Sequence, residues 1–181
     1  KLIETARPTP AERPPVTNVK EEGLESLIFN AMTNFGWLAG ENRCYDKEYA
    51  VDLAQLTAFL EATQEDTAAA LQLRTDGPVR RKFLARLQGE ITRRGTIDVL
   101  RKGIEHEKYH VDLFYGTPSP ENRKAVARHA ENRFSITRQL RYSREESRNA
   151  LDLALFINGL PIATFELKNS LTKQTVEDAV E

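Results

Sequence analysis

Two alternating apolar runs joined by Asn158-Gly159 constrain the fold of this chain more than any other feature. The runs span residues 151–157 and 162–168. Asn-Gly between two such runs is the strongest short-range signal for a β-hairpin, because a tight turn needs residues that tolerate a positive φ. The sequence therefore predicts two antiparallel strands within residues 149–169.

The alternation within these runs also predicts how the strands pair. Apolar residues occupy the odd-numbered positions of both: Leu151, Leu153, Leu155, Ile157, Ala163, Phe165 and Leu167. Because side chains alternate between the faces of a strand, the two apolar faces share one core only if odd positions pair with odd positions. A plain two-residue turn would pair odd with even, so we predict a three-residue connection or a β-bulge.

Three polar residues of the hairpin have the opposite parity and therefore share the other face: Asp152, Glu166 and Lys168. Asp152 should lie near Glu166, and two neighbouring carboxylates repel each other unless a cation lies between them. Mg²⁺ prefers carboxylate oxygens and also binds phosphate oxygens. A nearby lysine can orient or deprotonate a water and offset phosphate charge. The trio predicts metal-dependent hydrolysis of a phosphodiester.

An ordinary exposed hairpin with a Glu/Lys pair is the alternative, because E-x-K alone is a weak signal. Two details favour the metal site. Lys168 is the only one of the nine lysines with an acid two positions before it. Asp152 interrupts an apolar run, where a charge is costly. Asp98 and Asp112 are rival acids beside strand-like residues, but neither has a lysine or second acid at matching parity, so we expect structural roles for both.

The stretch D-L-A-L-F-I-N-G-L-P-I-A-T-F-E-L-K-N at residues 152–169 resembles the PD-(D/E)xK nuclease core. The form it resembles is the one carried by the restriction (motor) subunit of type I restriction-modification enzymes. Residues 95–103 and 132–140 agree with the same family, and the resemblance extends from about residue 21 onward. Leu151 replaces the proline of the superfamily name, a replacement that is common in the family.

The resemblance implies roles for individual residues. Asp152 and Glu166 would hold Mg²⁺, and Lys168 would position the attacking water. In related nucleases a helical glutamate supports the metal site, which makes Glu25 the candidate here and Glu22 the reserve. A flanking surface acid is the alternative interpretation of Glu25.

The expected fold is α/β, with a mixed central sheet of four or five strands flanked by helices in a restriction-endonuclease-like core. Residues 1–16 are rich in proline and are expected to form an extended lead-in. Residues 17–181 are expected to form a single nuclease domain, cut short at its C-terminal end from a larger motor subunit.

The resemblance further implies an endonuclease domain that cuts double-stranded DNA after ATP-driven translocation by other domains. Its partners would be the specificity and methylation subunits. The sequence has no G-x-x-x-x-G-K-[ST] loop, so ATP is expected to bind elsewhere in the full subunit. Two alternatives remain: a non-catalytic docking module between the motor subunit and its methyltransferase partners, and a stand-alone repair or junction nuclease.

Composition narrows the class of protein. Hydrophobic residues make up 40% and charged residues 29%, which is typical of soluble globular proteins. No apolar run reaches the ~18 residues of a membrane span. The single cysteine, Cys44, excludes an internal disulfide and suits a reducing compartment. We therefore expect a cytoplasmic protein without a membrane partner.

Charge is distributed unevenly, although the net charge is only −1. Residues 74–102 hold 9 Lys/Arg against 3 Asp/Glu, and residues 122–148 hold 8 against 3. Such segments can neutralise DNA phosphates if they fold onto one face, or they can simply solvate their helices. The candidate DNA contacts are Arg80, Arg81, Lys82, Arg138 and Arg141.

Elsewhere the sequence predicts three helices, at residues 19–35, 49–63 and 78–94. The first carries an apolar stripe that is expected to face the core: Leu24, Leu27, Ile28, Ala31, Met32 and Phe35. Residues 134–142 alternate like a half-buried strand. Arg138 falls on the apolar face of that strand and should therefore have a partner.

Overall fold

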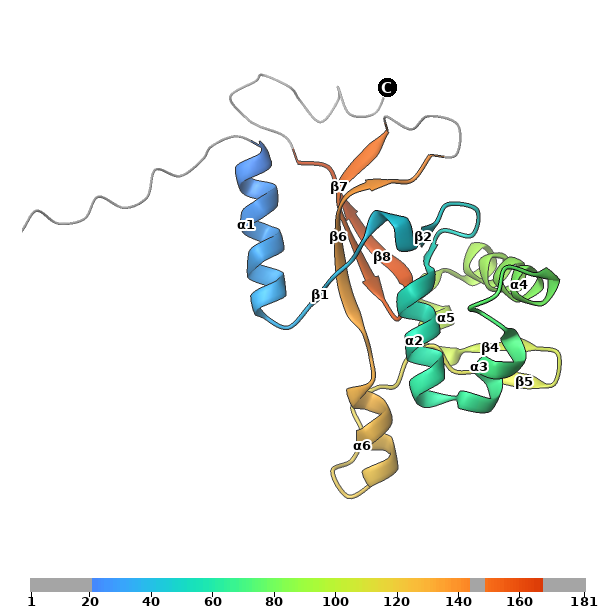
Figure 1. Ribbon diagram of the computed structural model, residues 1–181. Coiled ribbons are helices and arrows are strands. Elements are labelled where there is room, and N and C mark those ends of the chain that lie inside the picture. Colours follow the sequence, from blue (N-terminus) through green and yellow to red (C-terminus); the bar gives the residue numbers. More distant parts are fainter. Residues whose placement is uncertain (1–20, 144–148, 168–181) are drawn as a thin grey trace, which may run out of the picture.

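A mixed four-stranded sheet lies at the centre of the fold, as Figure 1 shows for this computed structural model. The structure describes residues 21–143 and 149–167. The strand order is β1-β6-β7-β8, with β1 parallel to β6 and the other pairs antiparallel. The strands are β1 (Leu38–Ala39), β6 (Phe134–Arg141), β7 (Ala150–Ile157) and β8 (Leu160–Phe165). The predicted lead-in at residues 1–16 lies outside the described residues.

Six α-helices surround this sheet in the described part of the chain. They are α1 (Glu21–Asn34), α2 (Leu53–Thr63), α3 (Glu65–Leu71), α4 (Pro78–Arg94), α5 (Thr96–Lys102) and α6 (Arg123–Ala130). Smaller elements are η1 (Asn42–Cys44) and two antiparallel ribbons, β2 (Tyr45–Asp46) with β3 (Val51–Asp52) and β4 (Ile104–His106) with β5 (Tyr109–Val111). The architecture is therefore α/β with a mixed sheet, as the sequence predicted.

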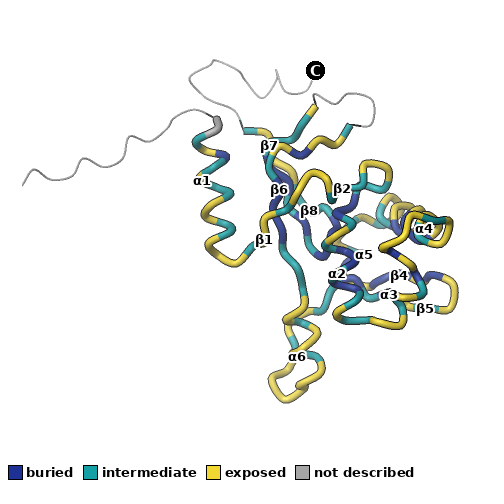
Figure 2. Tube along the Cα trace, in the orientation of Figure 1, coloured by how far each residue is buried: buried dark blue, intermediate teal, exposed yellow. Residues whose placement is uncertain are grey.

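The helices are distributed unequally around the sheet. Helix α1 packs alone on one side against β6 and β7, whereas α2 to α5 gather on the other side near β8 (Figure 1). The larger core lies among α2 to α5, and Figure 2 shows the buried trace there. Its largest fully buried side chains include Phe59, Phe83, Leu56, Leu60, Leu84 and Leu87. Among the described residues, the sheet thus has a thick, apolar side and a thinner side that is covered by α1.

The hairpin contains the β-bulge that was predicted from the pairing of odd-numbered with odd-numbered positions. Near the turn Ile157 pairs with Leu160, so the connection itself is the two residues Asn158 and Gly159. The register then shifts between Leu155 and Phe156. Beyond the shift odd positions pair with odd positions, as in Leu153 opposite Phe165. The predicted bulge is confirmed, and the alternative of a three-residue connection is not needed.

The hairpin turn is buried rather than exposed. Asn158 is fully buried with a φ of 50°, and its Nδ2 donates to the Leu113 carbonyl at 2.9 Å and to Asn132 Oδ1 at 3.0 Å. Its Oδ1 accepts a hydrogen bond from the backbone N–H of Arg133 at 2.6 Å. The Gly159 carbonyl accepts one from the backbone N–H at the start of α2. The turn therefore ties the hairpin to the thick side of the fold.

Several boundaries differ from the prediction. Helix α2 begins at Leu53, four residues later than predicted, because residues 51–52 form β3 and Asp52 caps the helix. Helices α1 and α4 match closely: Gly36 follows α1 with a φ of 92°, and α4 begins at Pro78. The expectation that Asp98 lies beside a strand was wrong, because α5 carries it.

The predicted inward stripe of α1 was also wrong in part. Leu24, Leu27 and Phe35 are exposed, with Phe35 at 88% of its full accessibility. The helix instead turns Glu25 toward the sheet, where it meets Arg138 of β6. An ion pair between helix and sheet thus sets the rotation of α1, and part of its apolar stripe faces outward.

Asp52 provides a test of stability against pH. The residue is buried, and its Oδ1 caps α2 by accepting the Gln55 backbone N–H at 3.1 Å. Burial raises the pKa of the Asp52 carboxyl above its usual value, while the helix N–H groups and Arg133 oppose the shift. The folded state therefore binds this proton more tightly than the unfolded state, and ionising Asp52 lowers stability as pH rises through the acidic range.

We expect Asp52→Asn to gain stability relative to the wild type as pH rises from about 3 to 7, because Asn also caps helices but carries no charge. Urea unfolding of both proteins across this range measures the difference. Asp52→Ala, which lacks the cap as well, should be less stable than Asp52→Asn at every pH. A difference between wild type and Asp52→Asn that does not change with pH would contradict the assignment.

Candidate carboxylate site at the end of the hairpin

Glu25 is the acid that α1 brings to the sheet. Only 4% of it is exposed, and its Oε1 accepts a hydrogen bond from Arg138 Nε at 2.5 Å. The Arg138 guanidinium also lies 5.4 Å from the centre of the Phe29 ring and donates to Ser26 Oγ at 3.1 Å. Arg138 therefore has the partner that its place in the strand predicted, and the ion pair offsets the cost of burying Glu25.

Gln139 joins Glu25 to the hairpin. Its Nε2 donates to Glu25 Oε2 at 2.7 Å and to Asp152 Oδ1 at 3.2 Å. Carboxylates from α1 and β7, 127 positions apart in the chain, thus meet at one amide nitrogen of β6. The structure brings together two of the acids that the sequence singled out.

Asp152 also binds the segment that carries the E-x-K motif. Its Oδ2 accepts the backbone N–H of Leu167 at 2.6 Å. Continuing the register of β7 and β8 places Glu166 opposite Asp152, one position beyond the last paired residue, Phe165. Glu166 is exposed. Lys168 lies outside the described residues, as does the side chain of Glu22.

The donors in this cluster are the kind that a divalent cation uses. Asp and Glu oxygens are hard ligands, and two carboxylates from separate elements suit Mg²⁺, which keeps several waters. Across residues 21–143 and 149–167, however, no three His, Cys, Asp or Glu side chains converge closely enough to form a complete ligand set. The described cluster therefore consists of two carboxylates, those of Glu25 and Asp152, beside the segment that carries Glu166.

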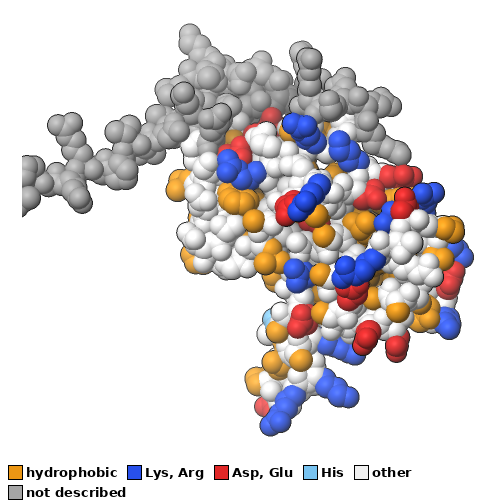
Figure 3. Space-filling model, in the orientation of Figure 1, with side chains coloured by type: hydrophobic (Ala, Val, Ile, Leu, Met, Phe, Trp, Pro, Cys, Tyr) orange, Lys and Arg blue, Asp and Glu red, His pale blue; other side chains and the backbone are white. Residues whose placement is uncertain are grey.

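The predicted DNA-binding residues on α4 are already engaged in ion pairs. Arg80 and Arg81 contact Asp76 at 2.8 Å and 3.1 Å, and Lys82 contacts Glu107 at 2.7 Å. Figure 3 shows Lys/Arg and Asp/Glu side chains interspersed on the face it views. Such pairing reduces the field that α4 presents to a phosphate backbone.

The two remaining basic candidates lie nearer the carboxylates. Arg138 is partly buried against Glu25, so its charge is largely used inside the fold. Arg141 ends β6 and is exposed, and its backbone N–H donates to Asn42 Oδ1 at 2.9 Å. Of the five candidate DNA contacts, Arg141 is therefore the one whose placement best suits a phosphate near the site.

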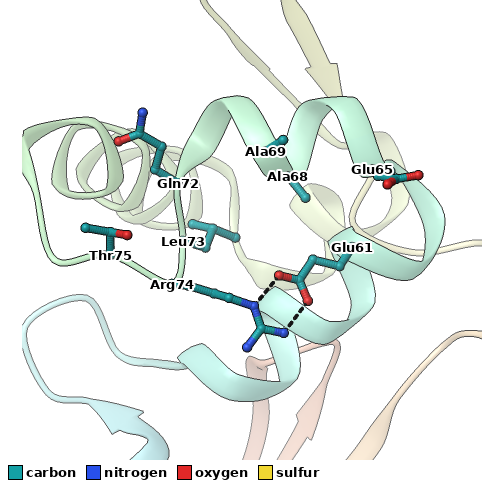
Figure 4. A pocket seen from close by; sticks show the side chains of 8 residues that line it. All are labelled: Glu61, Glu65, Ala68, Ala69, Gln72, Leu73, Arg74 and Thr75. Carbon is teal, nitrogen blue, oxygen red and sulfur yellow. Dashed lines mark hydrogen bonds and ion pairs between the residues drawn. The ribbon is translucent and has the colours of Figure 1, made fainter.

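A separate hollow lies between α2, α3 and the following turn, and Figure 4 shows its lining. Its main polar feature is a bidentate ion pair between Arg74 and Glu61. Arg74 Nε and Nη2 each lie 2.6 Å from a different carboxylate oxygen of Glu61. Of the predicted catalytic residues that the structure describes, Glu25, Asp152 and Glu166, none lines it. The hollow is therefore not the centre of the predicted chemistry.

The residue that sequence reasoning missed is Gln139. The alternation of residues 134–142 placed it among the polar positions of an ordinary strand. The structure gives it a φ of 47°, which is left-handed backbone in the middle of β6. Nothing in the alternation of a strand signals such a departure, so only the spatial structure could identify it.

Comparison with known proteins identifies a matching family. A family model described as Type I restriction enzyme R protein N terminus covers residues 18–181. No curated protein and no solved structure matches the chain. In addition, no helix within the described residues has both the length and the apolar character that a membrane crossing requires.

Proposed function

The chain belongs to the family of type I restriction enzyme R protein N-terminal domains, and from this premise we propose that it is a Mg²⁺-dependent DNA endonuclease domain with a PD-(D/E)xK core. The observation that carries the proposal is the convergence of Glu25 and Asp152 on Gln139, beside the segment that contains E-x-K. Family membership makes DNA and the other subunits of a restriction system the expected partners.

Each proposed catalytic residue has a distinct task. Asp152 and Glu166 bind the cation from the two arms of the hairpin, and Glu25 supports the site from α1. Lys168, two residues beyond Glu166, orients the attacking water and offsets phosphate charge. Mg²⁺ held by Asp152 and Glu166 would supply positive charge to offset the negative charge that develops on the phosphate oxygens.

The resulting reaction is hydrolysis of one phosphodiester bond. A water oxygen forms a bond to phosphorus, and the bond from phosphorus to one sugar oxygen breaks. The water loses a proton, and the departing oxygen gains one. The proposal assigns sequence recognition and ATP hydrolysis to other subunits and domains. The absence of a G-x-x-x-x-G-K-[ST] loop from the sequence agrees with this assignment for ATP.

A docking role is the second candidate, and the exposed apolar residues of α1 favour it. Leu24 and Leu27 are exposed on the helix that carries Glu25, and Phe35, which directly follows the end of that helix, is exposed as well. Such residues are typical of surfaces that contact another domain or subunit. Docking and cleavage are compatible on one domain, so loss of cleavage in a site variant separates a purely docking role from a catalytic one.

Lys168→Ala tests the proposed function most directly. In the reconstituted restriction complex, we expect this variant to lose DNA cleavage by about 10²-fold or more while its ATP hydrolysis stays at the wild-type rate. Supercoiled plasmid cleavage and phosphate release measure the two activities on the same samples. Lys108→Ala, on the β4–β5 ribbon, is the matched control and should cut normally. Normal cutting by Lys168→Ala would refute the catalytic assignment.

A further inference from the structure

Gln139 has an unusual backbone for its position. It lies in β6 between Arg138, which pairs with Leu153, and Leu140, which pairs with Leu151. Its φ of 47° is a conformation that residues with a Cβ adopt rarely, and then mainly outside strands. Such a conformation persists only where the surrounding structure imposes it, and it often marks a functional site.

The unusual backbone has a direct geometric result. In a regular strand, consecutive side chains point to opposite faces of the sheet. Here the consecutive residues Arg138 and Gln139 both contact Glu25, at 2.5 Å and 2.7 Å. The left-handed residue therefore places the amide on the side where α1 presents its carboxylate.

The amide itself suits the contact with two acids. The Nε2 of a glutamine carries two hydrogens, and here it has one carboxylate acceptor for each: Glu25 Oε2 and Asp152 Oδ1. A neutral amide can hold two carboxylates without cancelling their charge. Arg138 already pairs with Glu25, and a lysine or arginine at position 139 would add a second positive charge that also reaches Asp152 and competes with a cation.

We infer that Gln139 is a positioning residue, which sets the separation and orientation of Glu25 and Asp152 for a divalent cation. The inference rests on the proposed function, because it assigns a role within the same site. Gln139 would act through the two acids that its amide contacts. Outer residues of this kind typically change metal affinity by about 10–100-fold when they are replaced.

Two substitutions separate the amide from the backbone. Gln139→Gly removes the amide and accepts the left-handed conformation without strain, whereas Gln139→Met removes the amide but keeps the length and the strain. Gln72→Gly is the matched control, because Gln72 also has a left-handed φ, 51°, but lies at the end of α3. A purely conformational role would be preserved in Gln139→Gly.

The experiment uses the full-length subunit and its reconstituted complex. Mn²⁺ binding to the subunit without nucleotide is followed by electron paramagnetic resonance, and the binding lost in Asp152→Ala defines the site. The Mg²⁺ dependence of plasmid cleavage is measured in the complex. We expect Gln139→Gly and Gln139→Met each to weaken Mn²⁺ binding and raise the half-saturating Mg²⁺ concentration by about 10-fold or more. ATP hydrolysis should not change.

The outcomes distinguish this inference from the proposed function. If both Gln139 variants bind Mn²⁺ and use Mg²⁺ like the wild type while Asp152→Ala fails to cut, the proposed function stands and the role of Gln139 is overturned. The same holds if Gln139→Met alone is impaired, since strain would then explain the defect. If Asp152→Ala cuts normally, the proposed function fails and the inference falls with it.

Discussion

Replacing Asp152 with alanine should reduce DNA cleavage by the reconstituted complex to about one-thousandth of the wild-type rate or less, because the proposed site would lose a metal ligand. The same change removes the acceptor for the Leu167 backbone N–H and for one hydrogen of Gln139. The E-x-K segment would therefore lose this hydrogen bond to β7 as well. Plasmid linearisation at saturating Mg²⁺ and ATP measures the effect.

ATP hydrolysis and translocation should be unaffected in the Asp152→Ala complex, since the proposal assigns both to other domains. Asp66→Ala is the matched control, because this acid is exposed in the first turn of α3 and touches no predicted site residue. It should cut like the wild type. Cleavage by Asp152→Ala at a rate near that of Asp66→Ala would remove the central acid from the mechanism.

Gly159→Ala should cause the largest loss of stability among single substitutions in the hairpin. A Cβ built at Gly159 would lie 2.4 Å from the Asp52 carbonyl oxygen and 2.7 Å from the Leu56 nitrogen, both backbone atoms. The φ of 83° adds backbone strain that alanine tolerates poorly. Together these effects should cost about 3 kcal/mol or more, and lower Tm by roughly 6–12 °C.

Gly89→Ala, the same substitution at a different site, should raise stability, whereas Gly159→Ala should lower it. Gly89 is exposed within α4, and an added Cβ would meet nothing within 4 Å. Alanine is the better helix former there, so stability should rise by about 0.5–1 kcal/mol. Thermal unfolding of the two variants and the wild type tests whether Tm rises in Gly89→Ala and falls in Gly159→Ala. An unchanged Tm for Gly159→Ala would show that the turn does not pack as described.

The hairpin could be predicted well because its signals are local. The turn follows from Asn-Gly, and the bulge follows from the parity of the apolar residues on both sides of it. The shared face of Asp152 and Glu166 follows from the same counting. That face is not polar throughout, however, because Ala154 and Phe156 on it are fully buried, whereas Phe165 on the predicted apolar face is exposed. The alternation of residues cannot predict how deeply each side chain is buried. Asp152 is partly buried, whereas Glu166 is exposed just beyond the end of β8.

Elements that depend on distant partners were harder to predict. β1 has only two residues and exists through its parallel pairing with β6. The rotation of α1 follows from the contact between Glu25 and Arg138, which are 113 positions apart, and this contact outweighed the helix's own apolar stripe. The pairing of α4 arginines with acids such as Asp76 and Glu90 likewise altered a prediction that was based on charge counts alone.

The buried turn also protects the chain from a chemical reaction. Asn-Gly is the sequence most prone to deamidation, in which the glycine nitrogen attacks the asparagine side-chain carbon and ammonia leaves. In the native fold, three hydrogen bonds fix the Asn158 amide and restrict the rotation that the attack requires. When the fold opens, the protection is lost, and an aspartate or isoaspartate formed there would have to be buried on refolding. Deamidation of Asn158 can therefore accumulate with repeated unfolding, and the lifetime of the native domain depends on the rate at which this turn unfolds.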